Sequence, residues 1–195
     1  MIDLLFWMKV WVIIIFVSYA VIIFVRSMWV WYSYWSNQEY YETTNSAIKI
    51  IGEYLIKHKL DRGLLYDFGS SQWKFIFGLL KMCKNLKIIG IERDRFKSFW
   101  ANLANKFHRY KHTPLFLKED FMKTDISQAD IIFIYVPRIL LPKLRKKLQK
   151  EWKKNARVIL YRISFDDWKP TEIIQVGGHD KNPDNKISIY TCAGI

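Results

Sequence analysis

The sequence predicts an α/β fold: a mainly parallel sheet with helices on both faces, a closing antiparallel hairpin, and one transmembrane helix in front of it. From residue 64 onward, short apolar runs alternate with amphipathic stretches of helical length, which is typical of βα repeats. The last two apolar runs, TEIIQV and KISIYTC, are joined only by the turn-rich GGHDKNPDN, and this predicts a hairpin. The N-terminal segment, by contrast, is apolar on every side.

That N-terminal segment has the composition of a membrane-spanning helix. Within Val10–Val25, VWVIIIFVSYAVIIFV, only Ser18 is clearly polar, and a basic residue flanks the run on each side. Because the Lys9 side chain can reach the interface, the usable span extends from about Leu4 to Val25, close to the ~20 residues that a bilayer requires. The SYA at 18–20 resembles a signal-peptide cleavage site, but the VIIFV that follows it favours an uncleaved anchor.

The next segment, SMWVWYSYW, gathers aromatic side chains where a membrane helix would leave the bilayer. Five of the nine tryptophans lie in residues 1–35, as in an interfacial belt. We therefore expect three parts: residues 1–35 as the transmembrane helix and its belt, 36–46 as a polar connector, and 47–195 as the folded domain. The few charges close to the span weakly favour a location outside the cell for that domain.

The chain has a formal net charge of +13, and nearly all of it lies beyond the apolar segment. A domain this basic suggests an acidic partner, and charge alone leaves open whether this is nucleic acid, an anionic membrane or an acidic protein surface. Cys83 and Cys192 form no CxxC pair and the four histidines are scattered, so no zinc site is predicted. Both thiols are expected to be buried and reduced.

The elements of the domain follow one another in a regular order. A helix is expected over 47–60, with Thr44 or Asn45 as its cap and a break at 61–63. We then expect, in turn, strand 64–68, helix 73–83, strand 86–92, helix 95–107, strands 114–118 and 129–137, helix 140–152, strand 156–163 and the hairpin strands 171–176 and 186–192. In such a sheet a ligand binds at the carboxyl ends of the strands, where the strand order reverses.

Acidic residues stand at the ends of the first three expected strands. Asp67 and Gly69 lie in a strand-to-helix turn, where glycine lets the backbone approach a ligand closely. Glu92 ends the second strand 25 positions later, where a carboxylate typically accepts hydrogen bonds from ribose hydroxyls. Asp120 follows the third strand beside Phe121, which offers an acceptor for an adenine amino group and a ring to cover the base.

Each of these residues alone has an ordinary explanation, as a turn residue, a surface ion pair or a cap. Three acids in order at three strand ends instead describe a pocket shaped for adenosine. After the fourth strand, IYVP places Tyr135 and Pro137 at the mouth of that pocket.

The order Asp67-x-Gly69, Glu92, Asp120-Phe121 resembles that of class I S-adenosylmethionine-dependent methyltransferases. The DIS.AD run, YVP and the W.P at 168–170 further resemble the small membrane-associated protein-lysine methyltransferases, which include the enzymes for adenine nucleotide translocase and the membrane ring protein of ATP synthase. The likeness covers roughly 43–192. It implies a seven-stranded, Rossmann-like methyltransferase sheet with a terminal antiparallel hairpin, formed by residues 47–195.

The resemblance also implies S-adenosylmethionine as the cofactor, no metal, and a protein substrate, in particular a membrane protein. It assigns the cofactor contacts to Asp67, Gly69, Ser70, Ser71, Glu92, Asp120 and Phe121. Tyr135 and Trp168, which follow the fourth and fifth strands, are our candidates for the channel that receives the acceptor lysine. No histidine base is required, because desolvation between aromatic walls lowers the pKa of a lysine.

The first loop departs from the family pattern Asp-Leu-Gly-Ser-Gly-Asp-Gly-Arg. Here Ser71 replaces the second glycine, Gln72 the acid and Trp73 the third glycine. The Trp73 side chain either fills space that the methionine part of the cofactor uses, or points along the following helix into the core. The first arrangement would leave a domain with the fold but without catalysis.

The expected helix 140–152 carries leucines on one face and lysines on the other. We expect either a solvated face or contact with anionic lipid through Lys143, Lys146, Lys147 and Lys150. Nucleic acid is the less favoured partner, because no basic motif with interleaved aromatic residues accompanies these lysines.

Together these observations predict a single-pass membrane-anchored methyltransferase that uses S-adenosylmethionine and modifies a protein lysine. Because this cofactor is made in the cytoplasm, we place the domain on the cytoplasmic side, against the local charge pattern. Two alternatives stay open: a non-catalytic membrane-tethered interaction module with a degenerate cofactor loop, and an RNA methyltransferase.

Overall fold

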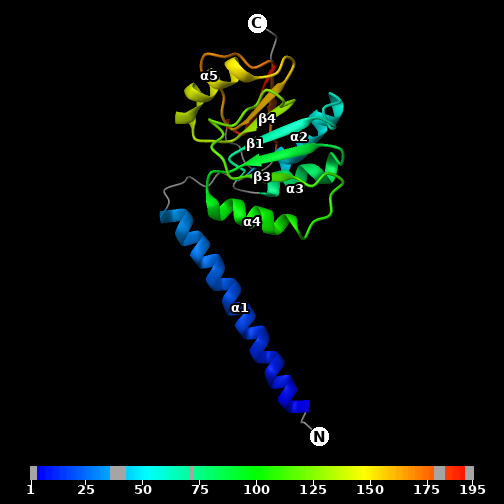
Figure 1. The fold of residues 1–195 in the computed structure, drawn as a ribbon, viewed down its shortest axis with the longest axis vertical. Helices are drawn as coiled ribbons and strands as arrows, with labels where there is room; N and C mark the ends of the chain where they lie inside the picture. Colours follow the sequence, from blue (N-terminus) through cyan, green and yellow to red (C-terminus); the bar gives the residue numbers. More distant parts are fainter. Residues whose placement is uncertain (1–3, 36–42, 71–72, 178–182, 192–195) are drawn as a thin grey trace. The chain divides into compact units, whose positions relative to one another are not determined.

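The structure is a computed structural model that describes residues 4–35, 43–70, 73–177 and 183–191. It divides into two compact units, Met1–Tyr40 and Tyr41–Ile195 (Figure 1). Each unit is considered by itself. Cys192 and the predicted cofactor contact Ser71 lie outside the described residues.

The first unit is a single helix, α1, over Leu4–Trp35. Within it, Phe6–Met28 is long and apolar enough to cross a membrane, a property that signal sequences share. None of this segment is buried inside the protein. The helix continues beyond the predicted Val10–Val25 core into the aromatic segment.

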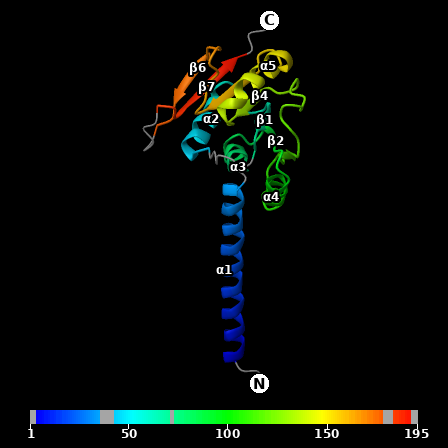
Figure 2. The same cartoon turned by 90° about the vertical axis from the view of Figure 1, so that its left-hand side faces the viewer.

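The second unit is built on a seven-stranded sheet with the order β3-β2-β1-β4-β5-β7-β6. The strands are β1 Leu64–Phe68, β2 Lys87–Ile91, β3 Leu115–Leu117, β4 Ile131–Ile134, β5 Arg157–Tyr161, β6 Glu172–Gln175 and β7 Lys186–Thr191. The first five are parallel, whereas β7 runs antiparallel to both of its neighbours, β5 and β6. Figure 2 shows β6 and β7 side by side at one end of the sheet. The predicted sheet and closing hairpin are confirmed.

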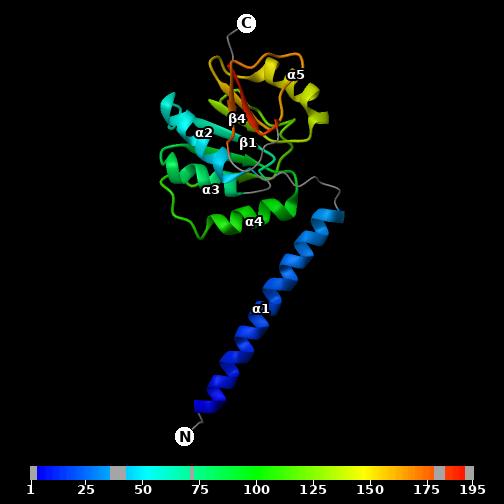
Figure 3. The same cartoon turned by 180° about the vertical axis from the view of Figure 1, so that it is seen from behind.

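Helices cover both faces of this sheet. The helices are α2 Asn45–Lys57, α3 Trp73–Met82, α4 Arg95–Asn105, the short 3-10 helix η1 Arg138–Leu140 and α5 Leu141–Glu151. Figure 3 looks onto the face that carries α2 and α3, and α5 lies on the opposite face, toward the viewer in Figure 1. Two side-chain caps fix helix starts: Thr44 Oγ1 accepts from the Ala47 amide, and Asp94 accepts from the first amides of α4.

The sheet separates two hydrophobic cores, and strand β4 contributes to both. Ile131 and Phe133 pack in the core beneath α2 and α3, and Ile132 and Ile134 pack in the core beneath α5. All four side chains are at most 2% exposed. A strand buried on both faces reads as an unbroken apolar run, which is why IIFI shows no polar alternation.

One side-chain prediction for α5 is wrong. Lys147 does not face solvent or lipid: its side chain is only 5% exposed and is paired with Glu151. The helical turn places position 147 beside Leu144 and Leu148, which are fully buried, so its stem lies at the edge of the core. The other three lysines of the predicted lipid contact, at 143, 146 and 150, are exposed.

Candidate functional site

The loop after β1 is fixed to the neighbouring strand by its backbone. The amides of Gly69 and Ser70 both donate to the carbonyl oxygen of Ile91, at 3.0 and 3.1 Å. Gly69 has φ +79°, a conformation that side chains with a Cβ rarely adopt, so glycine is required at this turn. The loop therefore passes over the carboxyl end of β2, on the edge where β1 and β4 diverge.

A second glycine makes this arrangement possible. A Cβ on Gly90, inside β2, would stand 2.7 Å from Ser70 Oγ and 2.9 Å from a carbon of Ile76 and of Phe116. Such distances are shorter than any real contact, so a side chain at 90 would displace the loop or the start of α3. Sequence reasoning missed Gly90, although a glycine inside an apolar strand is a known signal of close backbone approach.

Ser70 itself carries an unsatisfied polar atom. The residue is 2% exposed, and its hydroxyl oxygen has no hydrogen-bond partner within the described protein. Burying a hydroxyl without a partner costs about 1–3 kcal/mol. A ligand group that hydrogen-bonds this hydroxyl would recover that free energy, so the loop fits a polar ligand.

Two carboxyl groups lie close to this loop. Asp67 is 3% exposed, and burial, followed by the charge of Glu92, raises its pKa to about 8. Glu92 is 9% exposed, and its Oε1 accepts from the Asp94 amide at 2.8 Å. Burial also raises the pKa of Glu92, against the opposing effect of that amide and of the Lys97 ammonium group. A cationic ligand here would draw both groups toward their ionised forms.

Asp120 and Phe121 follow β3 in a tight turn. Asp120 Oδ1 accepts from the Met122 amide at 2.9 Å, so this carboxylate stabilises its own turn, as one alternative for it required. The Phe121 ring stacks on Phe68, the last residue of β1, with ring centres 5.2 Å apart and an interplanar angle of 14°. Phe121 is thereby held at the carboxyl end of β1, beside Asp67.

Trp73 points away from the loop. It is the first residue of α3, it is half-buried, and its side chain packs against the core beneath α2 and α3. Of the two arrangements considered for this residue, the structure has the one that leaves the methionine side of the loop free of its ring.

The two residues predicted for the acceptor channel lie apart. Tyr135 follows β4, and its ring meets Tyr161, the last residue of β5, edge to face at 5.0 Å. Trp168 instead packs against Trp152 and Tyr190. Tyr190 pairs with Val158, near the start of β5, so Trp168 lies toward the amino ends of the parallel strands. The structure therefore brings Tyr135, but not Trp168, to the edge that holds Asp67.

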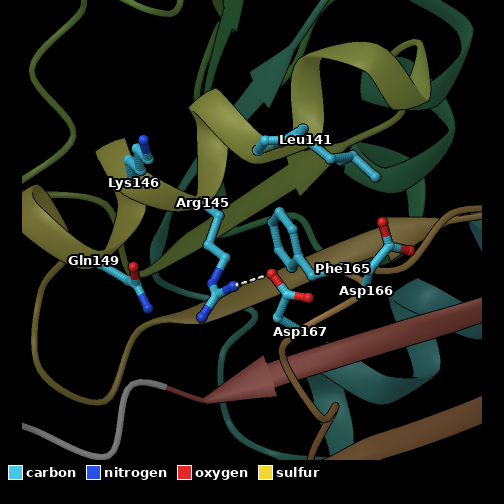
Figure 4. Close-up of a pocket in the computed structure, with 8 residues that line it drawn as sticks. Leu141, Arg145, Lys146, Gln149, Phe165, Asp166 and Asp167 are labelled. Carbon is cyan, nitrogen blue, oxygen red and sulfur yellow. Dashed lines mark hydrogen bonds and ion pairs between the residues drawn. The ribbon is translucent and has the colours of Figure 1, made fainter.

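A cavity of about 300 Å³ lies on another part of the domain, between α5 and residues 165–167. Figure 4 shows the Arg145 guanidinium group, which donates to Asp167 Oδ2 at 2.8 Å, at its edge. None of the predicted site residues lines this cavity. It is separate from the strand-end site.

Residues 67–172 match the family described as the ANTKMT methyltransferase domain. The matched segment begins at Asp67 and contains Glu92, Asp120 and Tyr135, which all follow strand ends. The chain belongs to this methyltransferase family.

Named relatives agree with the family. A protein-lysine N-methyltransferase of Saccharolobus islandicus is 26% identical over 129 residues, which cover 65% of this chain and 78% of that enzyme. The human lysine N-methyltransferase of the ATP synthase c-ring protein is 27% identical over 117 residues, 60% of this chain. The match spans only about half (49%) of the human enzyme.

The solved structures show the same fold. An RNA methyltransferase from Salinibacter ruber, crystallised with S-adenosyl-L-homocysteine, superposes with a TM-score of 0.68 at 19% identity, covering 80% of this chain and 96% of that one. The predicted methyltransferase family, fold class, enzyme class and S-adenosylmethionine cofactor are thus confirmed. The methyltransferase site fits this cofactor: a buried hydroxyl needs a partner, and two buried carboxyl groups suit a cationic, hydroxyl-bearing ligand.

Proposed function

We propose that this methyltransferase is a membrane-anchored enzyme that methylates the side-chain amine of a lysine in another protein. The family match over residues 67–172, which contains the strand-end acids, is the observation that carries the proposal. The lysine acceptor is supported by the names of the archaeal and human relatives. Attachment to a membrane is supported by the apolar length of Phe6–Met28.

Each cofactor contact has a physical role in this proposal. Glu92 would accept hydrogen bonds from the ribose hydroxyls, and Phe121 would cover the base that Asp120 recognises. Gly69, Ser70 and Ser71 would bring backbone and hydroxyl groups to the amino-acid part. Buried Asp67 would balance its positive charge.

When bound, S-adenosylmethionine supplies a methyl group on a sulfonium sulfur, and the neutral thioether leaves without needing an acid. The lysine nitrogen must be neutral, so that its lone pair can form the new bond to the methyl carbon as the sulfur–carbon bond breaks. Tyr135 would line the approach of this amine and help to desolvate it, which lowers its pKa. Alignment of amine and methyl group then supplies the main rate enhancement, and the proton released passes to water.

Tyr135 is held in place by a small network at the end of β5. The Tyr161 ring that contacts it is fully buried, and the Tyr161 hydroxyl donates to Asn185 Oδ1 at 2.9 Å. Thr44 Oγ1 lies 3.2 Å from the same hydroxyl. We assign Tyr161 a positioning role, since it is buried behind Tyr135.

We further propose the organisation 1–35 as transmembrane helix and belt, 36–46 as connector and 47–195 as the methyltransferase domain, facing the cytoplasm where the cofactor is made. Tethering raises the effective concentration of the domain near membrane-embedded substrates without any additional contact.

The first test is calorimetric titration of the full chain in detergent with S-adenosylmethionine and S-adenosylhomocysteine. We expect binding at about micromolar dissociation constants, weakened at least about tenfold by Glu92→Ala, because that carboxylate makes charge-assisted hydrogen bonds. Glu53→Ala is the matched control, since Glu53 is an acid exposed on α2. Absence of binding by a folded chain would favour the non-catalytic interaction module.

The second test identifies the acceptor. Membranes of the source organism that lack the active chain are incubated with purified protein and radiolabelled S-adenosylmethionine, and the products are hydrolysed. We expect the label in N-methyllysine. Label recovered in nucleic acid would instead support the RNA methyltransferase alternative.

A further inference from the structure

Helix α4 carries its large apolar side chains on the outer face. The residues that it buries against the sheet are small, Ser98 and Ala101. Phe96 and Phe99 are 44% and 60% exposed, and Phe107, just beyond the end of the helix, is 81% exposed. A surface helix of a globular protein normally has the reverse arrangement, with its large apolar residues inside.

These side chains form one continuous patch. Phe96 and Phe99 both contact Trp100 edge to face, with ring centres 5.9 and 5.8 Å apart. Phe107 follows two helical turns after Phe99 and Trp100, on the same side of the helix axis. Among the described residues from 43 onward, these three phenylalanines are the only exposed aromatic side chains.

The patch is surrounded by positive charge. Residues 93–111 contain one acid, Asp94, whose carboxylate caps α4 by accepting from the Phe96 and Lys97 amides. The same stretch contains six basic residues: Arg93, Arg95, Lys97, Lys106, Arg109 and Lys111. Arg95 and Lys106 are exposed, so their charges are available to an anionic surface next to the rings.

We propose that this outer face of α4, defined by Phe96, Phe99, Trp100 and Phe107 with Arg95 and Lys106, inserts into the headgroup region of an anionic lipid bilayer. Aromatic rings bordered by long cationic side chains are the composition of helices that lie in a membrane interface. A cytosolic protein partner would not need this much positive charge around an apolar patch. The same chain also carries a segment apolar enough to span a bilayer, which would keep the domain near that surface.

The α4 face fits a bilayer better than the lysines of α5 do. On α5 the leucines at 141, 144 and 148 are all buried, so only the charges of Lys143, Lys146 and Lys150 are presented. Electrostatic attraction alone is screened within about 8 Å at physiological salt, whereas inserted rings add apolar burial. The inference does not depend on which molecule is methylated.

The test places a nitroxide label on the full chain in protein-free vesicles of phosphatidylcholine with about one-third phosphatidylglycerol. One label replaces Phe99 (Phe99→Cys) and the matched control replaces exposed Lys150 (Lys150→Cys), both in a Cys192→Ser background. Cys83 is 1% exposed and stays unlabelled. A second label at Phe107→Cys guards against a local effect at position 99.

We expect labels at 99 and 107 to be about tenfold less accessible to a water-soluble paramagnetic reagent than the label at 150. Arg95→Glu combined with Lys106→Glu, or vesicles without phosphatidylglycerol, should remove most of that protection. Equal accessibility at 99, 107 and 150 would overturn the proposal. Protection that occurs in native membranes but not in protein-free vesicles would also overturn it, and would indicate a protein partner.

Discussion

The buried carboxyl group of Asp67 makes a quantitative prediction about stability and pH. Its pKa is about 8 in the folded protein because of burial and the neighbouring Glu92, against an ordinary value of 3.8. Between these values the folded chain keeps a proton that the unfolded chain has lost. Folding therefore takes up a proton, and the free energy of unfolding must fall as the pH rises from about 4 to about 8.

The size of the effect follows from the shift. One pKa unit corresponds to about 1.4 kcal/mol, so a shift of about four units removes on the order of 5 kcal/mol of stability across this window. Asp67→Asn keeps the shape of the side chain but cannot ionise. We expect the variant to lack this part of the pH dependence, and to be more stable than the wild type above about pH 8.

The assay is urea unfolding of the full chain in detergent, followed by tryptophan fluorescence at intervals between about pH 4 and pH 9. Glu53→Gln is the matched control, because Glu53 is exposed and should not change the profile. If wild type and Asp67→Asn lose stability in parallel over the whole window, Asp67 is ionised in the folded state and the reasoning from burial is refuted.

Three further substitutions test the packing. Gly90→Ala should destabilise the fold by about 1–3 kcal/mol and weaken cofactor binding, because its Cβ would overlap Ser70 Oγ; unchanged binding in calorimetry would contradict the close approach. Gly69→Ala should lower the melting temperature through its positive φ, by about 1 kcal/mol in stability, and an unchanged thermal melt would exclude that strain. Glu151→Ala should destabilise the fold more than Lys147→Met, because only the former leaves a buried ammonium group unpaired; the reverse order in urea unfolding would argue against burial of that pair.

The sequence was sufficient for the elements whose pattern is local. The βα alternation predicted each strand, and Thr44 was one of two predicted caps for α2. Asp67 and Glu92 could be placed at one edge because parallel strands end on the same side of a sheet. Their roles in cofactor binding stay predictions.

What the sequence could not give depends on contacts between distant residues. Trp168 follows β5 in the chain, but the backbone turns back after Tyr161 and carries it to Tyr190, away from the acids. Lys147 looked like part of a charged face because its spacing alone does not show how wide the buried stripe is. Gly90 acquires its role only from the loop that crosses it.

The position of β7 inside the sheet has a consequence for synthesis of the protein. Among the described strands, β6 pairs only with β7, and β7 also covers β5, so residues 186–191 complete two pairings at once. A nascent chain that has not yet released these residues from the ribosome leaves one side of β5 open and β6 without a strand beside it. The sheet can therefore close only after residues 186–191 have emerged, long after the apolar N-terminal segment has left the ribosome. A stalled ribosome would thus leave β5 as an open edge, a site for pairing with other incomplete chains.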